Sequence, residues 1–198
     1  MKPNVGMLYP VAAPITSYTP GTGITYGNGF VVCEARGATI NYEYASGEFY
    51  GDDVRLDSEN GLIGYSIDFE SSGLKGLVRS KLLGEKVIAT DEYRITGADS
   101  PDMGFGFIRK MREDVGGQNV TRYEAWWGHK MKFSIGSEET RTKENQIEWR
   151  VPTLSGKGDG VYLDSDENPA FIDHKDFETL AAAKSYLNTK ANIQTVTT

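Results

Sequence analysis

The clearest pattern along the chain is an alternation of apolar and polar side chains over residues 62–71. The apolar members are Ile63, Tyr65, Ile67 and Phe69. Successive side chains of a strand point to opposite faces, so this segment predicts a strand with one buried face. Asn60 and Gly61 come directly before it, and both tolerate the positive φ angles of a tight turn. The pattern therefore predicts a turn followed by a strand.

Similar stretches elsewhere predict further strands. They cover residues 5–9, 30–34, 38–44, 87–96, 104–111, 122–134 and 146–153. In the stretch 38–44, Ile40, Tyr42 and Tyr44 share one face. The content of tyrosine, phenylalanine and glycine also favours strands separated by turns. The sequence thus predicts a mainly β fold.

Two segments have the 3.6-residue period of a helix instead. The first is 74–83, with Ser72 as its candidate cap and Gly84 as its stop. Its apolar stripe consists of Leu74, Leu77, Val78 and Leu82. The second is 176–187, with Phe177, Leu180, Ala181, Lys184 and Leu187 on one flank. Adding these two helices makes the expected class α+β.

Three segments lack a regular period. Residues 1–29 are rich in Pro, Gly, Thr and Tyr and predict a short strand followed by an irregular arm. Residues 45–60 carry five acidic side chains around an aromatic pair and predict a long loop between strands. Residues 156–169 predict another exposed loop. No internal repeat is found, so the 198 residues are taken as one domain.

The charge balance changes the range of possible functions. A formal net charge of -7 disfavours a grip on nucleic acid phosphates, which needs clustered Lys and Arg. An acidic surface nevertheless suits a protein past which DNA must slide. Cys33 is the only cysteine, so no intrachain disulfide can form, and folding in the cytoplasm is expected. The first 20 residues hold no apolar run for a membrane span or signal peptide.

Candidate chemistry is sparse. His129 and His174 lack nearby metal-ligand companions and are interpreted as packing or surface residues. The residues Asp164, Asp166 and Asn168 copy the start of a calcium-binding loop. However, Pro169 and Lys175 stand where that loop needs Gly and Glu. Neither a phosphate-binding glycine motif nor a nucleophile motif is found. We therefore assign no catalytic, cofactor or metal site and expect a protein that is not an enzyme.

Trp126 and Trp127 are adjacent and must point to opposite faces of their strand. One indole is expected to fill the core and the other to meet solvent or a partner. Exposed aromatic side chains are enriched in interfaces, which favours a subunit contact over a ligand platform.

Several segments, read in order, carry a resemblance to a known family. They are residues 48–53 (EFYGDD), 62–70, 74–84, 123–133 with the Trp pair, 134–143, 147–156 and 177–187. Their order and spacing resemble the major tail proteins, or tail tube proteins, of long-tailed bacteriophages with non-contractile tails. The resemblance extends over residues 38–187.

The resemblance implies an antiparallel β-sandwich with a flanking helix and a C-terminal helix. Such subunits form hexameric rings that stack into a tube, the conduit through which DNA is ejected into the host. An early loop reaches the neighbouring ring, which implies an inter-ring role for Phe49, Tyr50, Asp52 and Asp53. The expected location is the virion tail, assembled in the host cytoplasm. The expected partners are further copies, a tape-measure protein, a tail terminator and distal tail proteins, with no membrane and no cofactor.

Alternatives from other classes remain open at this point. A tube protein of a contractile tail or of a secretion machine would share the fold. A carbohydrate-binding β-sandwich could use Trp126, Trp127 and Tyr123 as a stacking platform, with acidic loops that hold calcium. An enzyme would need paired carboxylates facing each other across a cleft.

Overall fold

The computed structural model describes residues 4–51, 54–71, 73–135, 153–164 and 168–194. Most of these residues lie in antiparallel strands, and two helices complete the fold, which confirms the mainly β, α+β class. The elements are β1 (Asn4–Thr19), β2 (Gly23–Tyr26), β3 (Phe30–Val31), β4 (Ala35–Gly51), β5 (Val54–Ser71), α1 (Gly76–Leu83), β6 (Lys86–Ala89), β7 (Glu92–Arg94), β8 (Met103–Val115), β9 (Gln118–Ile135), β10 (Thr153–Gly158), β11 (Ile172–Phe177) and α2 (Leu180–Lys190). Of the predicted strand 146–153, only its last residue falls within the described part of the chain.

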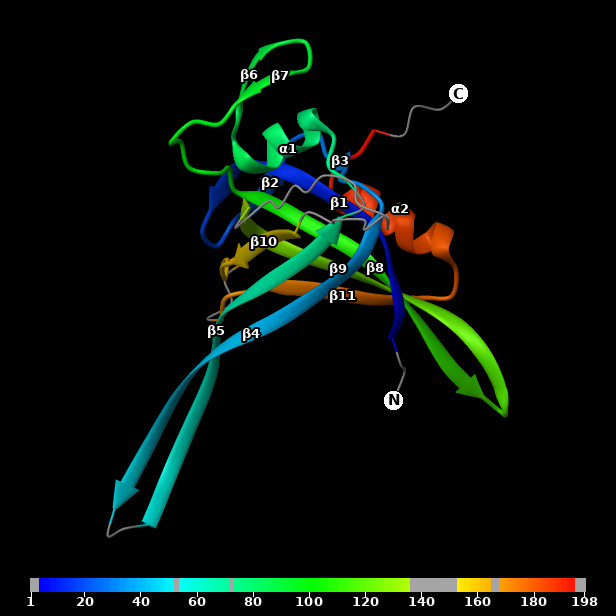
Figure 1. Cartoon of the computed structure of the whole chain (residues 1–198). Helices are drawn as coiled ribbons and strands as arrows, with labels where there is room; N and C mark the ends of the chain where they lie inside the picture. Colours follow the sequence, from blue (N-terminus) through cyan, green and yellow to red (C-terminus); the bar gives the residue numbers. More distant parts are fainter. Residues whose placement is uncertain (1–3, 52–53, 72, 136–152, 165–167, 195–198) are drawn as a thin grey trace, which may run out of the picture.

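The main sheet has the strand order β2-β1-β8-β9-β10-β5-β4, with β3 added to β1 and β11 added to β9 (Figure 1). Strand β9 is its centre. One edge of β9 pairs with β8 along nearly its whole length. The other edge is shared, because β11 pairs with Tyr123–Gly128 and β10 pairs with Met131–Ile135. This division lets the sheet fold over on itself.

The core between the two halves of the folded sheet is aromatic. It joins buried side chains from β1, β5, β8, β9, β10 and α1, among them Tyr65, Phe69, Phe105, Phe107, Trp126, Phe133 and Leu82. The rings of Phe105 and Phe133 meet edge to face with centroids 5.1 Å apart. Aromatic pairs in this arrangement add to the stabilisation from burial alone.

Helix α2 covers the opposite face of the sheet and makes a second core. Its buried Ala183 and Leu187, followed by Ala191, pack against Val11, Ala13, Ile108, Ala125 and Trp127 of β1, β8 and β9. Thr179 caps the helix by accepting a hydrogen bond from the backbone of Ala182. The helix therefore begins later than the predicted segment 176–187, whose first two residues belong to β11.

Helix α1 matches its predicted segment closely. Gly84 ends it in the left-handed conformation, as predicted. The N-cap is Lys75, which makes no side-chain capping bond, and the predicted cap Ser72 lies outside the described residues.

The predicted irregular arm over residues 1–29 is wrong. Strand β1 occupies 16 of these residues and pairs with β8, and β2 folds back on it. Val11, Ala12 and Ala13 are completely buried because β1 lies between both cores. Gly6 and Pro10 lie at register shifts between β1 and β8, and Gly21 lies in the turn between β1 and β2, so these residues interrupt the ladder without ending it.

Candidate assembly surfaces

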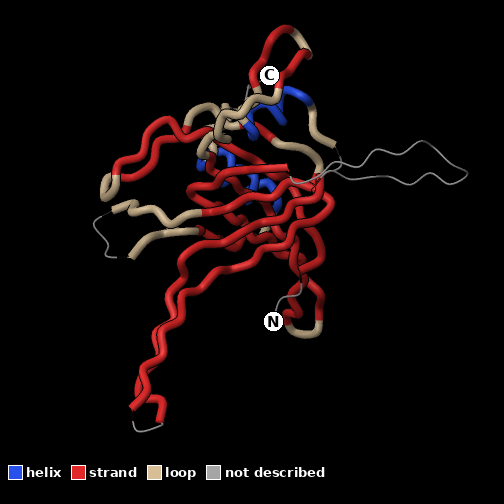
Figure 2. The backbone as a smooth tube through the Cα atoms, turned by 60° about the vertical axis from the view of Figure 1, so that its left-hand side comes forward, coloured by secondary structure: helices blue, strands red, loops and turns tan. Residues whose placement is uncertain are grey.

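Strands β4 and β5 extend far beyond the core as a two-stranded ribbon, called here the β4–β5 arm and comprising residues 45–60 (Figures 1 and 2). The two strands stay paired from Ala35 opposite Ser71 to Gly51 opposite Val54. The prediction of a loop over residues 45–60 is therefore wrong, because the ladder continues through this segment. Asn60 and Gly61 do not form the predicted turn either, since they pair with Ser46 and Ala45.

The four residues expected to contact a neighbouring ring belong to the end of this arm. Phe49 and Tyr50 lie in β4, opposite Asp57 and Arg55 of β5, and their side chains are outside the described set. Asp52 and Asp53 join the two strands and lie outside the described residues. At the root of the arm, the side chains of Tyr42, Tyr44 and Ile63 are well exposed.

Strand β4 is also the last strand in the sheet order. Within the described part of the chain, no strand pairs with its outer edge, which is 17 residues long. At ~3.3 Å per residue this edge extends for roughly 55 Å. An unpaired edge of this length is a template for pairing with another chain.

Trp126 and Trp127 point to opposite faces of β9, as predicted, but both are buried within the subunit. Trp126 stacks on Phe107 with centroids 5.0 Å apart. Trp127 donates a hydrogen bond of 3.3 Å to the hydroxyl of Tyr26. The expectation that one indole is exposed is wrong, because α2 covers the second face. The pair therefore offers neither the subunit contact nor the carbohydrate platform considered from the sequence, and Tyr123 is half-buried against the second core.

Tyr26 shows how closely this second face is packed. Its hydroxyl donates to the backbone carbonyl of His129 at 2.9 Å while accepting from Trp127. Burial raises the pKa of Tyr26 to about 12, and the hydrogen bond from Trp127 opposes that rise. The phenol is therefore neutral at physiological pH and acts as a structural link.

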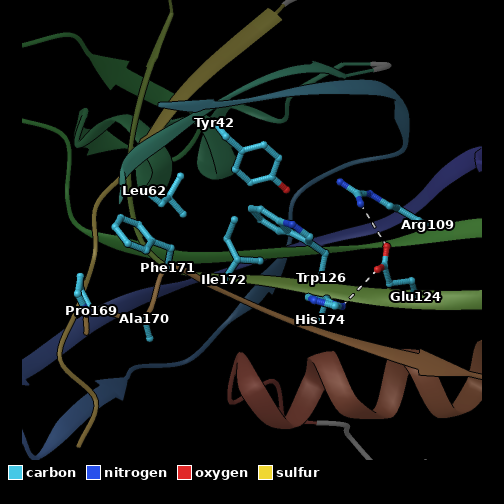
Figure 3. Close-up of a pocket in the computed structure, with 10 residues that line it drawn as sticks. All are labelled: Tyr42, Leu62, Arg109, Glu124, Trp126, Pro169, Ala170, Phe171, Ile172 and His174. Carbon is cyan, nitrogen blue, oxygen red and sulfur yellow. Dashed lines mark hydrogen bonds and ion pairs between the residues drawn. The ribbon is translucent and has the colours of Figure 1, made fainter. Parts of the chain in front are cut away.

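A pocket of about 490 Å³ opens at the root of the β4–β5 arm (Figure 3). Its apolar part includes Leu62, Phe171 and Ile172, and Tyr42 lies over it. A neighbouring pocket of about 330 Å³ shares Tyr42 and Arg109 with it and extends toward β1. The two pockets together follow the inner side of β4.

The polar end of the larger pocket is formed by one ion pair and one neighbouring histidine, from three strands. Arg109 of β8 donates to Glu124 of β9 at 3.2 Å, and Nδ1 of His174 on β11 lies 3.5 Å from the same carboxylate (Figure 3). Because Glu124 already engages the guanidinium, the charges at this end largely neutralise each other. This arrangement ties β8, β9 and β11 together and gives no nucleophile beside a base.

The two histidines have different environments. His129 is only 3% exposed, and its Nε2 lies 3.1 Å from Asp173 of β11, whereas His174 is exposed. Lys190 of α2 lies 2.6 Å from the other oxygen of Asp173. These contacts, with His129 the larger contributor, hold the pKa of Asp173 well below its usual range. This cluster leaves no signal in the sequence, because His129 is far along the chain from Asp173 and Lys190.

Of the acidic residues considered for calcium, Asp166 lies outside the described residues. Among all the residues that the structure describes, no three His, Cys, Asp or Glu side chains are grouped so that they could hold a metal ion.

No helix in the described ranges is long and apolar enough to cross a membrane.

A scan of protein-family models and a search of curated proteins found no match to this chain.

Proposed function

We propose that this chain is a structural subunit that assembles into stacked hexameric rings and forms the tube of a long bacteriophage tail. The observation that carries the proposal is the β4–β5 arm, a paired ribbon that projects from a subunit whose central strand β9 is already covered on both faces. Two strands alone are marginally stable in water, so an arm of this length favours contact with another chain.

The free edge of β4 supports the same proposal. Edge strands invite uncontrolled aggregation unless they are closed, and a ring of identical subunits closes every edge. The number six comes from the family resemblance. A net charge of -7 is compatible with a lumen through which DNA passes without sticking. The tape-measure, terminator and distal tail proteins belong to the same proposal, as does the virion location. A tube of a contractile tail or secretion machine shares these features.

Electron microscopy of the purified protein over a concentration series tests the proposal. The test variant joins Ser46 to Asn60 by an Asn-Gly turn, which shortens the arm at a register where these two residues already pair. The matched control removes two cross-strand pairs from the β8–β9 hairpin, those of Asp114 and Val115 with Asn119 and Gln118.

The intact protein and the control are expected to form rings and tubes. The shortened arm is expected to stop at single rings with an unchanged melting temperature. A monomer at every protein and salt concentration contradicts the proposal. Tubes from the shortened arm contradict the role of the arm in stacking.

A further inference from the structure

The segment after β5 forms a small projection that stands apart from the main sheet. It comprises residues 76–95, with α1, β6 and β7, and is called here the α1–β7 lobe. Strands β6 and β7 pair only with each other among the described strands. Four large apolar side chains of the lobe are 38% to 74% exposed, namely Leu77, Val87, Ile88 and Ile95. Exposed apolar side chains of this size are available for contact with a partner surface.

The lobe is held firmly at its base. The ring of Tyr93 on β7 packs directly on Gly76, at the place where any larger residue would carry its Cβ. On the other side of α1, Leu82 is completely buried in the aromatic core. Gly76 therefore allows the β6–β7 hairpin to dock on α1.

The lobe has a small excess of positive charge in a chain that is acidic overall. Arg79 and Glu85 pair with each other at 2.8 Å. The other charged residues of the lobe are Lys81, Lys86 and Arg94, against Asp91 and Glu92, and Lys75 directly precedes the lobe. The β4–β5 arm has the opposite balance, with five carboxylates and a single arginine. The large apolar residues within the arm are Phe49, Tyr50, Val54 and Leu56.

The lobe and the arm lie at opposite ends of the molecule. Figure 1 shows β6 and β7 at the top and the end of the arm at the bottom, and the turned view in Figure 2 agrees. When identical rings stack in the same direction, the contact is head to tail. A surface at one end of a subunit then meets a surface at the opposite end of another subunit.

We propose that the α1–β7 lobe is the receiving surface for the β4–β5 arm of a second copy of this chain in the adjacent ring. The inference rests on the proposed function and adds the second half of the contact. The acidic and partly apolar sequence of the arm is complementary in composition to the exposed apolar residues, lysines and arginines of the lobe. Complementary charge of this kind fixes the register of an interface and rejects wrong partners.

Disulfide trapping between full-length chains tests the contact directly. In a Cys33→Ser background, one variant carries Tyr50→Cys in the arm and another carries Ile88→Cys in the lobe. The two are mixed and oxidised, and crosslinked dimers are scored on a non-reducing gel. The matched control replaces Ile88→Cys by Val115→Cys, an apolar residue 50% exposed on the β8–β9 hairpin. We expect crosslinked dimers from the lobe pair and none above background from the control pair.

Charge reversal tests the same contact in the assembled state. Lys86 and Arg94 face each other across β6 and β7, so Lys86→Glu with Arg94→Glu inverts the charge of the lobe at one place. Stacking is expected to require on the order of tenfold or more protein, while single rings persist. Adding Asp52→Lys and Asp53→Lys in the arm is expected to restore tubes. Lys110→Glu with Arg112→Glu on β8 serves as the control.

The outcomes separate this inference from the proposed function. Tubes from the intact protein, together with unaffected stacking of the charge-reversed lobe and no lobe crosslink, overturn the receiving surface and leave the tube proposal standing. If neither assembly nor a crosslink forms, both fail. A lobe crosslink with charge rescue supports the inference.

Discussion

Strand β9 and the β4–β5 arm belong to the same sheet and have opposite environments. Strand β9 buries side chains on both of its faces, under the aromatic core on one side and α2 on the other. The arm continues the same type of ladder where neither core accompanies it, and residues 43–46 at its base are exposed. Backbone pairing is thus common to both, while burial differs. We expect substitutions in β9 to change stability and substitutions in the arm to change assembly.

The largest expected effect comes from the tryptophan pair. Trp126→Ala and Trp127→Ala each remove a completely buried indole, and each is expected to lower the free energy of unfolding by about 3 to 5 kcal/mol. Chemical denaturation monitored by circular dichroism measures both. If one of the two variants loses less than about 1 kcal/mol, that indole does not contribute as a buried side chain should, and the two-sided burial of β9 is wrong.

The next effect compares two glycines. A Cβ on Gly158 of β10 would collide with the ring of Tyr65, whereas no atom outside the chain neighbours lies within 4 Å of the corresponding position on Gly61, which directly follows the arm. Gly158→Ala is expected to cost about 1 to 3 kcal/mol through overpacking. Gly61→Ala is expected to be neutral or slightly stabilising, because alanine restricts the unfolded chain. Equal melting temperatures for the two variants would contradict the packing of Tyr65 against β10.

A smaller effect depends on pH. The pKa of Asp173 is below its ordinary value of 3.8 in the folded protein, because His129 and Lys190 stabilise its charged form. Its contribution to stability is therefore complete above about pH 4 and is lost as the pH falls further. In thermal melts, Asp173→Asn is expected to be less stable than the intact protein at pH 7, with a difference that shrinks between about pH 4 and pH 2. The exposed residue Asp91, changed to Asn, is the control, and a pH-independent difference for Asp173→Asn would contradict the ion-pair explanation.

These comparisons also indicate what the sequence could predict. The strand over 62–71 and the end of α1 at Gly84 depend on local patterns, and both were predicted correctly. The second face of β9 could not be predicted, because α2 begins only at Leu180, far beyond the end of β9 at Ile135. The arm was missed because its glycines and acidic residues are typical of loops, while continued pairing depends on the facing strand. The cluster around Asp173 likewise joins three distant elements.

The smallest expected effect on stability is that of a substitution at Ile63, which lies between the buried part of β5 and the arm. By alternation, Ile63 should share the buried face of Ile67, but the register shifts between Glu43 and Tyr44, and Ile63 is left unpaired and 60% exposed. Ile63→Ala should therefore change the free energy of unfolding by less than about 0.5 kcal/mol, whereas Ile67→Ala on the same strand should cost about 2 to 5 kcal/mol. Both values come from the same denaturation experiment. A similar loss of unfolding free energy in the two variants would mean that Ile63 is buried in the core and that β5 has no bulge at this position. If Ile63→Ala leaves stability unchanged but raises the protein concentration needed for rings, the side chain acts at a subunit contact. That result would support the expected division, in which β9 determines stability and the region of the arm determines assembly.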